Sequence, residues 1–435
     1  MIQGDYRAAI DVGTTKVCVI IATNGPDGQA EMVGIGSAPC DGLRKGTVAD
    51  IPSLATSIRN AVEAAEKQSG LSIDKMYVGL SGSHIRSESR WTHVPRQPGV
   101  HTVTDGDIKL AMEGVARSEP VPGRRVLHVL PGSYTLDGTR GVKNPTGMHA
   151  AEMHVQSQVV SGSAEQINAL EDAVRMAGYR PASAIVEPMA IAEAVFNPDE
   201  LEGITALVEI GGSKTDIAVF RDGIVIYAAA LPVGGYQFTN DLAIGFSLPY
   251  AEAEKLKVEH GTVTPDVSGP GLELLIKPAG MAGALTITQR DVGMVLRDRA
   301  EELFEMVRIR LSAPELAGVT VDRMVLTGGG AKLEGIQSLA KHALQIKVRK
   351  GVPKGMGGLP EANRDPSHAA VMGLIIWAMR NLPPDNHLAR NRQSTRGGHH
   401  GHSVLSSLRE WLPVWGAREP RPALEKSQAA VAPTK

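Results

Sequence analysis

The stretch AAIDVGTTKV, from Ala8 to Val17, decides the fold, because an apolar β-type run stops at glycine and threonine and then resumes as strand. The same pattern returns in LVEIGGSKTDIAVF (Leu207–Phe220), and a third glycine turn follows an apolar run in VLTGGGAKLEG (Val325–Gly335). Glycine permits a close backbone turn and hydroxyl groups add donors, so such turns suit an anionic phosphate. Two hairpins of this kind, far apart in one chain, predict two similar lobes that face one polyphosphate.

With these motifs the chain resembles the actin-like ATPase superfamily and, within it, the FtsA family of bacterial cell-division proteins. The three glycine segments are similar to two phosphate segments and one adenosine segment of that family, in the same order. IVEPMAIAEAV (Ile185–Val195) resembles its helix between the lobes, and Pro232–Gly261 matches its pattern closely. The resemblance covers most of the chain. It implies an α/β, two-lobed actin-like (ribonuclease H-like) ATPase fold with an inserted α+β subdomain, and ATP and Mg²⁺ as cofactors.

A nucleotide site of this kind surrounds the phosphates with backbone N–H groups, hydroxyls and compact positive charge. Asp11 ends the first strand, and its carboxylate predicts a mediating Mg²⁺ because it would otherwise repel a phosphate. The resemblance places Glu254 and Lys257 beside the ribose and adenine, although residues three apart on a helix also suit a plain ion pair. The residues expected to bind the nucleotide are Asp11, Gly13, Thr14, Thr15, Lys16, Gly211, Gly212, Ser213, Lys214, Gly234, Gly235, Glu254, Lys257, Gly328, Gly329 and Gly330.

The second phosphate turn departs from the family pattern at three positions. Glu209 stands where the family usually has Asp, Ser213 where it has Gly, and Lys214 where it has Thr. Glu209 and Glu187 are the catalytic candidates, which would orient an attacking water. An ordinary charge in the first helical turn is the alternative for Glu187. A carboxylate moved by one methylene misplaces what it orients, so we expect ATP to be held but hydrolysed slowly or not at all.

The composition is that of an ordinary globular protein. The chain has 435 residues, of which 42% are hydrophobic and 21% charged, and this length suits two or three domains. A formal net charge of -2 gives no reason to expect nucleic acid as a partner. Two cysteines, Cys18 and Cys40, are too few for a disulfide framework and favour a reducing cytosol. We expect neither a secretory signal nor a segment that spans a bilayer.

Hydrophobic periodicity and turn residues divide the chain into nine segments. Helices are expected at Leu54–Glu66, Asp105–Ala116, Ile167–Gly178 and Gln289–Leu311, with a helical region at Phe238–Glu259 and a loop at Pro265–Gly283. The expected segments are the first part of lobe 1 (1–82), the inserted subdomain (83–165), the second part of lobe 1 with the connecting helix (166–197), the core of lobe 2 (198–234), its subdomain (235–311), the remaining core with a closing helix (312–382), a flexible linker (383–402), an amphipathic membrane helix (403–415) and a disordered tail (416–435).

The segment SVLSSLREWLPVW, from Ser403 to Trp415, has the pattern of an amphipathic helix. At 100° per residue six of its apolar side chains fall within an arc of about 120°, and two tryptophans on one face suit a membrane interface. A helix that docks back on the globular body is the alternative, which the polar sequence before it disfavours. The residues expected to contact the membrane are Val404, Leu405, Leu408, Trp411, Leu412 and Trp415.

The resemblance implies FtsA-type function: a protein on the cytoplasmic face of the membrane, at the division septum, that tethers FtsZ filaments and polymerises head to tail. Its expected partners are FtsZ, further copies of the chain and an anionic membrane surface. An actin-like adaptor of type IV pilus assembly is the alternative. A sugar kinase or a chaperone-type ATPase of the same superfamily is less supported, because neither a sugar pocket with a carboxylate base nor a peptide-binding β-domain is recognisable in the sequence.

Overall fold

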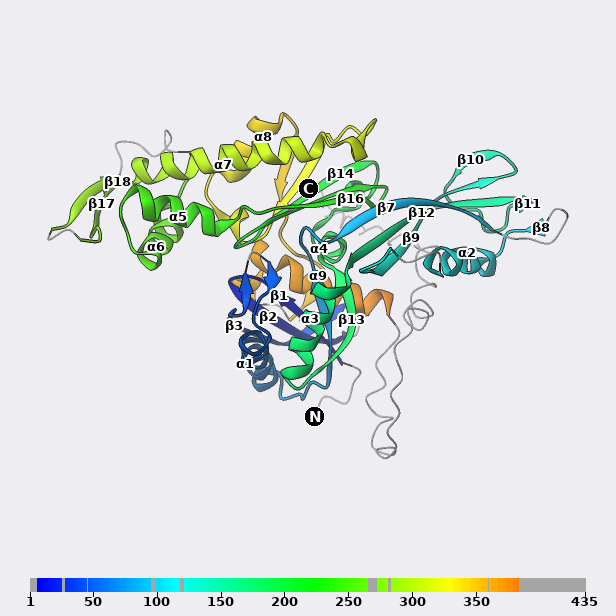
Figure 1. Cartoon of the computed structure of the whole chain (residues 1–435), viewed down its shortest axis with the longest axis horizontal. Coiled ribbons are helices and arrows are strands. Elements are labelled where there is room, and N and C mark those ends of the chain that lie inside the picture. Colours follow the sequence, from blue (N-terminus) through cyan, green and yellow to red (C-terminus); the bar gives the residue numbers. More distant parts are fainter. Residues whose placement is uncertain are drawn as a thin grey trace, which may run out of the picture.

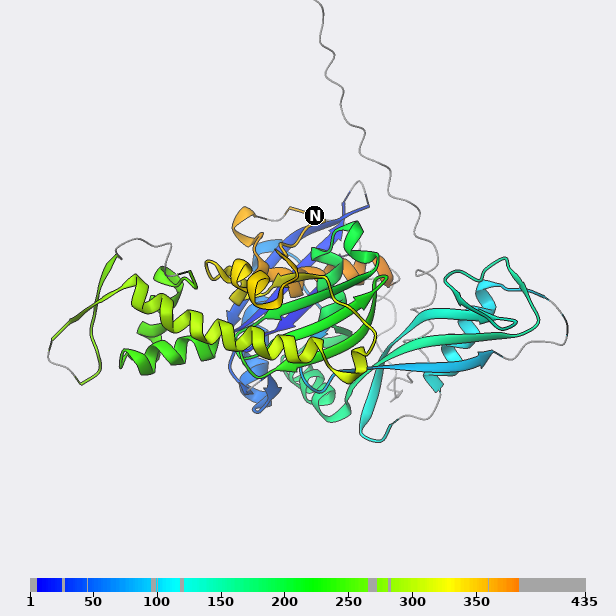
Figure 2. The same ribbon diagram turned by 90° about the horizontal axis from the view of Figure 1, so that it is seen from above.

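The computed structural model describes residues 6–382, except 26–27, 45, 95–98, 100, 118–120, 265–271, 281–282 and 359. Two similar lobes form its centre, and a separate unit extends from each end (Figures 1 and 2). The predictions for 383–402, 403–415 and 416–435 concern residues outside the described part of the chain. Within the described part, no helix is long and apolar enough to cross a membrane.

Lobe 1 is built on a six-stranded sheet in the order β13-β6-β1-β2-β3-β21. The glycine turn of the first motif joins β1 to β2 as an antiparallel hairpin, and α1 packs beside it with its apolar stripe buried. The strands are β1 (Tyr6–Val12), β2 (Lys16–Asn24), β3 (Ala30–Pro39), β6 (Lys75–Leu80), β13 (Arg180–Val186) and β21 (Met356–Gly357), with a small ribbon of β4 (Leu43–Arg44) and β5 (Thr47–Val48). The helices are α1 (Ile51–Ser69), α3 (Ala164–Met176), α4 (Glu187–Val195) and α9 (Ala369–Asn381).

Lobe 2 is built on a five-stranded sheet in the order β16-β15-β14-β19-β20. Its strands are β14 (Ile204–Ile210), β15 (Thr215–Arg221), β16 (Ile224–Leu231), β19 (Arg323–Thr327) and β20 (Lys347–Lys350). Its other elements are α5 (Gly235–Gly245), α6 (Tyr250–His260), α7 (Gln289–Leu311), α8 (Ile336–Leu344) and the hairpin β17 (Glu273–Ile276)–β18 (Leu285–Thr288). The outer unit of this lobe consists of α5, α6, the hairpin and one end of α7 (Figure 1).

The two sheets share one topology. Lobe 1 runs β3-β2-β1-β6-β13 and lobe 2 runs β16-β15-β14-β19-β20. In each, three strands form an antiparallel meander, and two further strands join parallel to the first strand of the lobe. The actin-like two-lobed α/β fold expected from the repeated hairpin is therefore confirmed, and the duplication places the β1–β2 tip and the β14–β15 tip at equivalent points.

The inserted subdomain leaves lobe 1 after β6 and returns before α3. It is a sheet in the order β10-β9-β12-β7, with α2 packed on one face and a small β8–β11 ribbon beyond (Figure 2). Val94, Met112 and Met153 are buried between helix and sheet. The elements are β7 (Arg86–Val94), β8 (His101–Thr102), α2 (Asp105–Arg117), β9 (Arg124–Leu136), β10 (Thr139–Val142), β11 (His149–Ala150) and β12 (Met153–Ser163). This α+β unit is the insertion that the sequence predicted.

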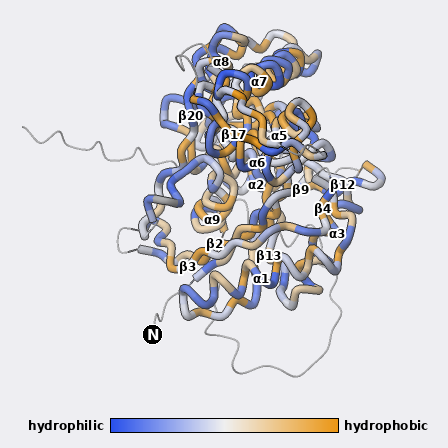
Figure 3. Tube along the Cα trace, turned by 90° about the vertical axis from the view of Figure 1, so that its left-hand side faces the viewer, coloured by the Kyte–Doolittle hydropathy of each residue, from blue (hydrophilic) through white to orange (hydrophobic). Residues whose placement is uncertain are grey.

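Helices α4 and α9 lie between the two sheets (Figure 1). Helix α9 is apolar over most of its length, as its colour in Figure 3 shows, and its residues from Ala369 to Ala378 are buried. The two helices cross where a Cβ on Gly373 would overlap the carbonyl oxygen of Ala190 and lie 2.7 Å from the nitrogen of Ile191. This close packing holds the first turn of α4 in position. Glu187, the first residue of α4, therefore lies between the lobes.

Several expected elements differ in their bounds: the helix expected at Leu54–Glu66 is α1 (Ile51–Ser69), and the one expected at Ile167–Gly178 is α3 (Ala164–Met176). The connecting helix begins at Glu187, because Ile185 and Val186 belong to β13 and pair with β6. The helical region Phe238–Glu259 is two helices, separated by a turn that ends at Pro249. The expected loop Pro265–Gly283 contains strand β17, whose Leu274 and Ile276 are buried against lobe 2. Tertiary contact explains the last difference, since a four-residue strand has little periodicity of its own.

Candidate functional site

Two turns of the same form face one another at the tips of the central hairpins. In lobe 1 the N–H of Gly13 donates to the carbonyl of Lys16 at 3.1 Å, and in lobe 2 the N–H of Gly211 donates to the carbonyl of Lys214 at 2.9 Å. Across the gap the hydroxyls of Thr14 and Ser213 are 2.7 Å apart. The structure therefore brings the first and second glycine motifs together, although they are almost 200 residues apart in sequence.

Glycine is required at the second tip by close packing between the lobes. A Cβ on Gly212 would lie 2.5 Å from Cγ2 of Thr15, and one on Gly234 would lie 2.6 Å from the carbonyl oxygen of Gly211. The N–H of Gly235 donates to that same carbonyl at 2.9 Å. The Gly234-Gly235 turn thus packs directly against the second phosphate-type turn, and its contact with a nucleotide stays a prediction.

Three carboxylates converge behind these turns. Glu187 begins α4, Glu209 lies near the end of β14 and Asp216 near the start of β15, and one oxygen of each lies within 4.8 Å of the others. Burial, then the charge of Asp11, raises the pKa of Glu187 to about 8. Burial also raises the pKa of Asp11 to about 6, and burial with the Glu187 charge raises that of Glu209 well above its usual value. The cluster and Asp11 together therefore carry less negative charge at neutral pH than four ionised carboxylates would.

The Lys214 ammonium lies inside this cluster. Its Nζ is 2.6 Å from Oδ2 of Asp216 and donates to Oγ of Ser81 at 2.5 Å. Ser81, at the end of β6, in turn donates to Glu187. Burial alone lowers the pKa of Lys214, but the charges of Asp216 and Glu187 outweigh it and hold the pKa above its usual value. Lys214 therefore stays charged and joins lobe 2 to lobe 1.

The third glycine segment packs against the second. Gly328 has φ 84°, and a Cβ there would lie 2.5 Å from the carbonyl oxygen of Ile210. Its N–H donates to the carbonyl of Pro366 at 3.2 Å. A Cβ on Gly330 would also strike the Ile210 side chain. Gly328, Gly329 and Gly330 thus form a bare backbone turn beside the end of β14, where the resemblance places the adenosine.

Glu254 and Lys257 form the ion pair that was their alternative interpretation, and they also border the site. Lys257 Nζ is 2.8 Å from Oε2 of Glu254 and donates to the carbonyl of Gly235 at 3.1 Å. It further donates to the hydroxyl of Thr239 at 2.7 Å. The pair therefore fastens α6 to the first turn of α5. A role beside the ribose and adenine stays a prediction.

Several residues of the site were not singled out in the sequence. Asp216 follows Lys214 by two residues, and this spacing places both on one side of an extended chain, so the signal was present. Ser81 and His368 gave no local signal, because they meet Lys214 and Lys16 only through the fold. His368 Nε2 lies 3.3 Å from Nζ of Lys16.

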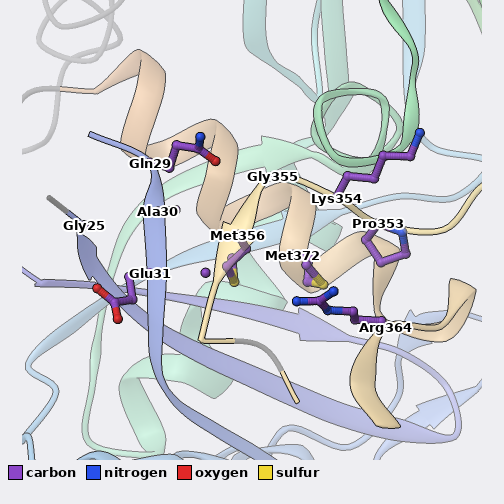
Figure 4. A pocket seen from close by; sticks show the side chains of 11 residues that line it. Gly25, Gln29, Ala30, Glu31, Pro353, Lys354, Gly355, Met356, Arg364 and Met372 are labelled. Atoms are coloured by element: carbon purple, nitrogen blue, oxygen red, sulfur yellow. The ribbon is translucent and has the colours of Figure 1, made fainter. Parts of the chain in front are cut away.

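Two cavities differ in size and chemistry. The first, of about 40 Å³, is lined mainly by residues of lobe 1, including Thr14, Ser81 and Glu187, and by Lys214 of lobe 2. The second, of about 630 Å³, lies between the starts of β3 and the segment around β21, with Glu31 and Arg364 on opposite sides (Figure 4). Nucleotide sites need convergent polar groups. We therefore assign the candidate site to the region of the smaller cavity, which Thr14 of the first turn and Lys214 of the second line beside Glu187.

Comparison with known sequences finds division proteins along the chain. Residues 206–373 match the model of the cell division protein FtsA, and residues 82–161 match the SHS2 domain inserted in FtsA. The chain is 31% identical over 411 residues to the cell division protein FtsA of Pseudomonas aeruginosa, covering 94% of this chain and 98% of that protein. It is 28% identical over 375 residues to FtsA of Escherichia coli K12, covering 85% and 89% respectively.

Solved structures share the fold at lower identity. The PilM-PilN type IV pilus biogenesis complex contains a chain with TM-score 0.60 and 19% identity, which covers 86% of this chain and 98% of that one. MreB5 of Spiroplasma citri bound to ADP gives TM-score 0.53 at 13% identity, covering 86% and 96%. At these identities the likeness shows the actin-like fold alone.

Proposed function

The chain belongs to the family of the cell division protein FtsA, and from this premise we propose that it binds ATP between its lobes and tethers FtsZ filaments to the membrane. In this proposal the protein acts on the cytoplasmic face of the membrane at the septum and polymerises head to tail. Nucleotide binding serves to set the arrangement of the lobes, so turnover of ATP is not the main output.

One observation carries the nucleotide part of the proposal. Two turns of identical hydrogen bonding, one from each lobe, meet at Thr14 and Ser213. Backbone N–H groups at such tips bind phosphate oxygens. The structure of MreB5 bound to AMPPNP, a protein of the same fold, lends support by analogy. A triphosphate requires more room than the cavity of about 40 Å³ provides, so binding would part the Thr14–Ser213 contact and move the lobes.

The two outer units are the proposed surfaces for partners. The unit of α5, α6 and β17–β18 exposes large apolar side chains, including Ile244, Val258 and Leu275, which are each more than 70% exposed. Exposed apolar side chains of this number on one unit are typical of a protein-binding surface. We assign FtsZ and neighbouring copies of the chain to this unit and to the inserted subdomain, and membrane attachment to Ser403–Trp415.

A role in type IV pilus assembly is the second candidate, and the fold neighbour PilM is its only support. That likeness is at 19% identity, whereas the division proteins match the sequence along nearly its full length. Genes for FtsZ beside this one would favour division, and pilus genes beside it would favour the alternative.

The experiment is flotation of FtsZ with liposomes that contain phosphatidylglycerol. We expect FtsZ to float only when this protein is present, and more FtsZ to float with ATP than without. A matched sample with uncharged phosphatidylcholine liposomes should recover little of either protein. Flotation of FtsZ that is the same with and without this protein would contradict the tether.

A further inference from the structure

Lys214 occupies the position in the turn of lobe 2 that Lys16 occupies in the turn of lobe 1. Each lysine closes the turn at the tip of its hairpin through its own carbonyl group, which accepts from Gly13 or Gly211. The two side chains then differ in direction. Lys16 reaches His368, whereas Lys214 turns into the carboxylate cluster. The site therefore holds two fixed ammonium groups beside the facing turns.

The Lys214 side chain is held in a slot formed by lobe 1. A Cβ on Gly46, in the turn between β4 and β5, would lie 3.2 Å from its Cδ, and one on Gly82 would lie 3.9 Å from its Nζ. The side chain is 19% exposed, and that of its partner Asp216 is 7% exposed. Burial of this ammonium against paired oxygens fixes its position, because an unpaired charge there would be strongly unfavourable.

The carboxylate cluster itself has the geometry of a cation site. Oxygens of Glu187, Glu209 and Asp216 lie within 4.8 Å of one another, and carboxylates are the protein ligands that Mg²⁺ prefers. However, Lys214 Nζ is 2.6 Å from the Asp216 carboxylate and is linked to Glu187 through Ser81. A divalent ion here would share its ligands with a fixed positive charge. The residues present therefore do not fit a bound Mg²⁺ at this cluster.

We propose that Lys214 is the resident cation of the nucleotide site, so that this chain binds a nucleoside triphosphate with little dependence on Mg²⁺. The inference rests on the proposed nucleotide binding and specifies it further. The ammonium offsets the carboxylates that would otherwise repel the phosphates, which is the role predicted from sequence for a metal at Asp11. Lys16 supplies a second positive charge from the opposite turn.

The first test measures metal binding without nucleotide, using Mn²⁺ detected by electron paramagnetic resonance. We expect the unmodified protein to bind no Mn²⁺ tightly and Lys214→Thr to bind a Mn²⁺ ion at least about tenfold more tightly. Lys347→Thr, the same change at an exposed lysine on β20, should behave as the unmodified protein. Binding by the unmodified protein that equals that of Lys214→Thr would overturn the inference.

The second test titrates a fluorescent ATP analogue in excess Mg²⁺ or in excess EDTA. The dissociation constant of the unmodified protein should differ by less than about threefold between the two conditions, whereas that of Lys214→Thr should weaken by about tenfold or more in EDTA. A loss of tenfold in the unmodified protein overturns the inference and leaves nucleotide binding intact. If the unmodified protein binds the analogue in neither condition, both this inference and the proposed nucleotide binding are wrong. The two dissociation constants of the unmodified protein are decisive by themselves, even if Lys214→Thr does not fold.

Discussion

At the residue scale, the three departures in the second phosphate turn all lie against polar or charged groups of the folded site. Ser213 bonds to Thr14 of the opposite turn, and Lys214 bonds to Asp216 and Ser81. Glu209 is partly buried beside both Glu187 and Asp216, and desolvation together with their charges raises its pKa. Ser213 and Lys214 therefore both contribute contacts between the lobes.

The first prediction concerns turnover. The triple variant Glu209→Asp, Ser213→Gly and Lys214→Thr should release phosphate from Mg-ATP at least about tenfold faster than the unmodified protein, because a shorter carboxylate and a neutral donor free the space for water. Affinity for ATP in Mg²⁺ should stay within a few-fold. A colorimetric phosphate assay measures the rate. Release on the order of one per second by the unmodified protein, typical of working enzymes, would contradict the prediction.

The second prediction concerns Glu187 and pH. Its folded pKa of about 8 lies above the value of the unfolded chain, so the folded state keeps a proton that the unfolded state loses above about pH 4.5. Stability due to this group therefore falls as pH rises from about 4.5 to 8. Glu187→Gln stays neutral and should be close to the unmodified protein at pH 5.

At pH 8 the Glu187→Gln variant should be more stable than the unmodified protein by about 1 kcal/mol or more, since one pKa unit corresponds to about 1.4 kcal/mol. Urea unfolding at both pH values measures the difference. The control Glu202→Gln, at an exposed carboxylate, should show no change with pH. An equal effect of Glu187→Gln at pH 5 and pH 8 would show that burial does not raise the pKa.

Much of the candidate site could be predicted from the sequence at this scale. The remaining residues could not be predicted, for a physical reason. Each glycine motif pointed to its turn because the required backbone geometry depends on local residues. Ser81 could not be found, since it meets Lys214 only after β6 and β14 come together from different lobes. The position of the Lys214 ammonium likewise depends on tertiary contacts, so the sequence did not predict it.

At the element scale, prediction succeeded where local periodicity is strong. Helix α7 has the expected bounds, Gln289–Leu311, because its capping box at Thr288 and Asp291 and its apolar stripe are all local features. The sequence predicts a loop at strand β17, because four residues beside glycine and proline carry too little pattern. Its pairing with β18 is that of a hairpin, but its burial against the rest of lobe 2 depends on residues far away in the sequence.

The third prediction concerns the crossing of α4 and α9. Gly373→Ala should lower the free energy of unfolding by about 1–3 kcal/mol, because the new methyl group meets the backbone of Ala190, which cannot move aside as a side chain could. The matched control is Gly114→Ala in α2, where a Cβ has open space. That change should stabilise the protein by up to about 1 kcal/mol through helix propensity. Equal effects of both changes in urea unfolding would contradict the close crossing.

At the scale of the whole molecule, the duplicated sheet explains how one chain makes a two-sided site. Both lobes present a hairpin tip, a parallel strand end and a helix toward the same space, so each half supplies one turn. The sequence predicted this arrangement because the repeat is visible in the motifs themselves. It did not predict how tightly the lobes meet, since that depends on side chains such as Lys214 that cross between them.

The last prediction concerns attachment of the whole molecule to a membrane through Ser403–Trp415, which lies outside the described residues. The sequence alone carries it. Six apolar side chains share one arc of a predicted helix, and burying a large apolar side chain contributes about 1.5–3 kcal/mol. Trp411→Glu places a charge on that apolar arc, so the variant should lose most of its flotation with anionic liposomes. Ser406→Glu adds the same charge on the opposite side and should lose far less, because its carboxylate stays in water. If both variants float as well as the unmodified protein, attachment depends on another part of the chain.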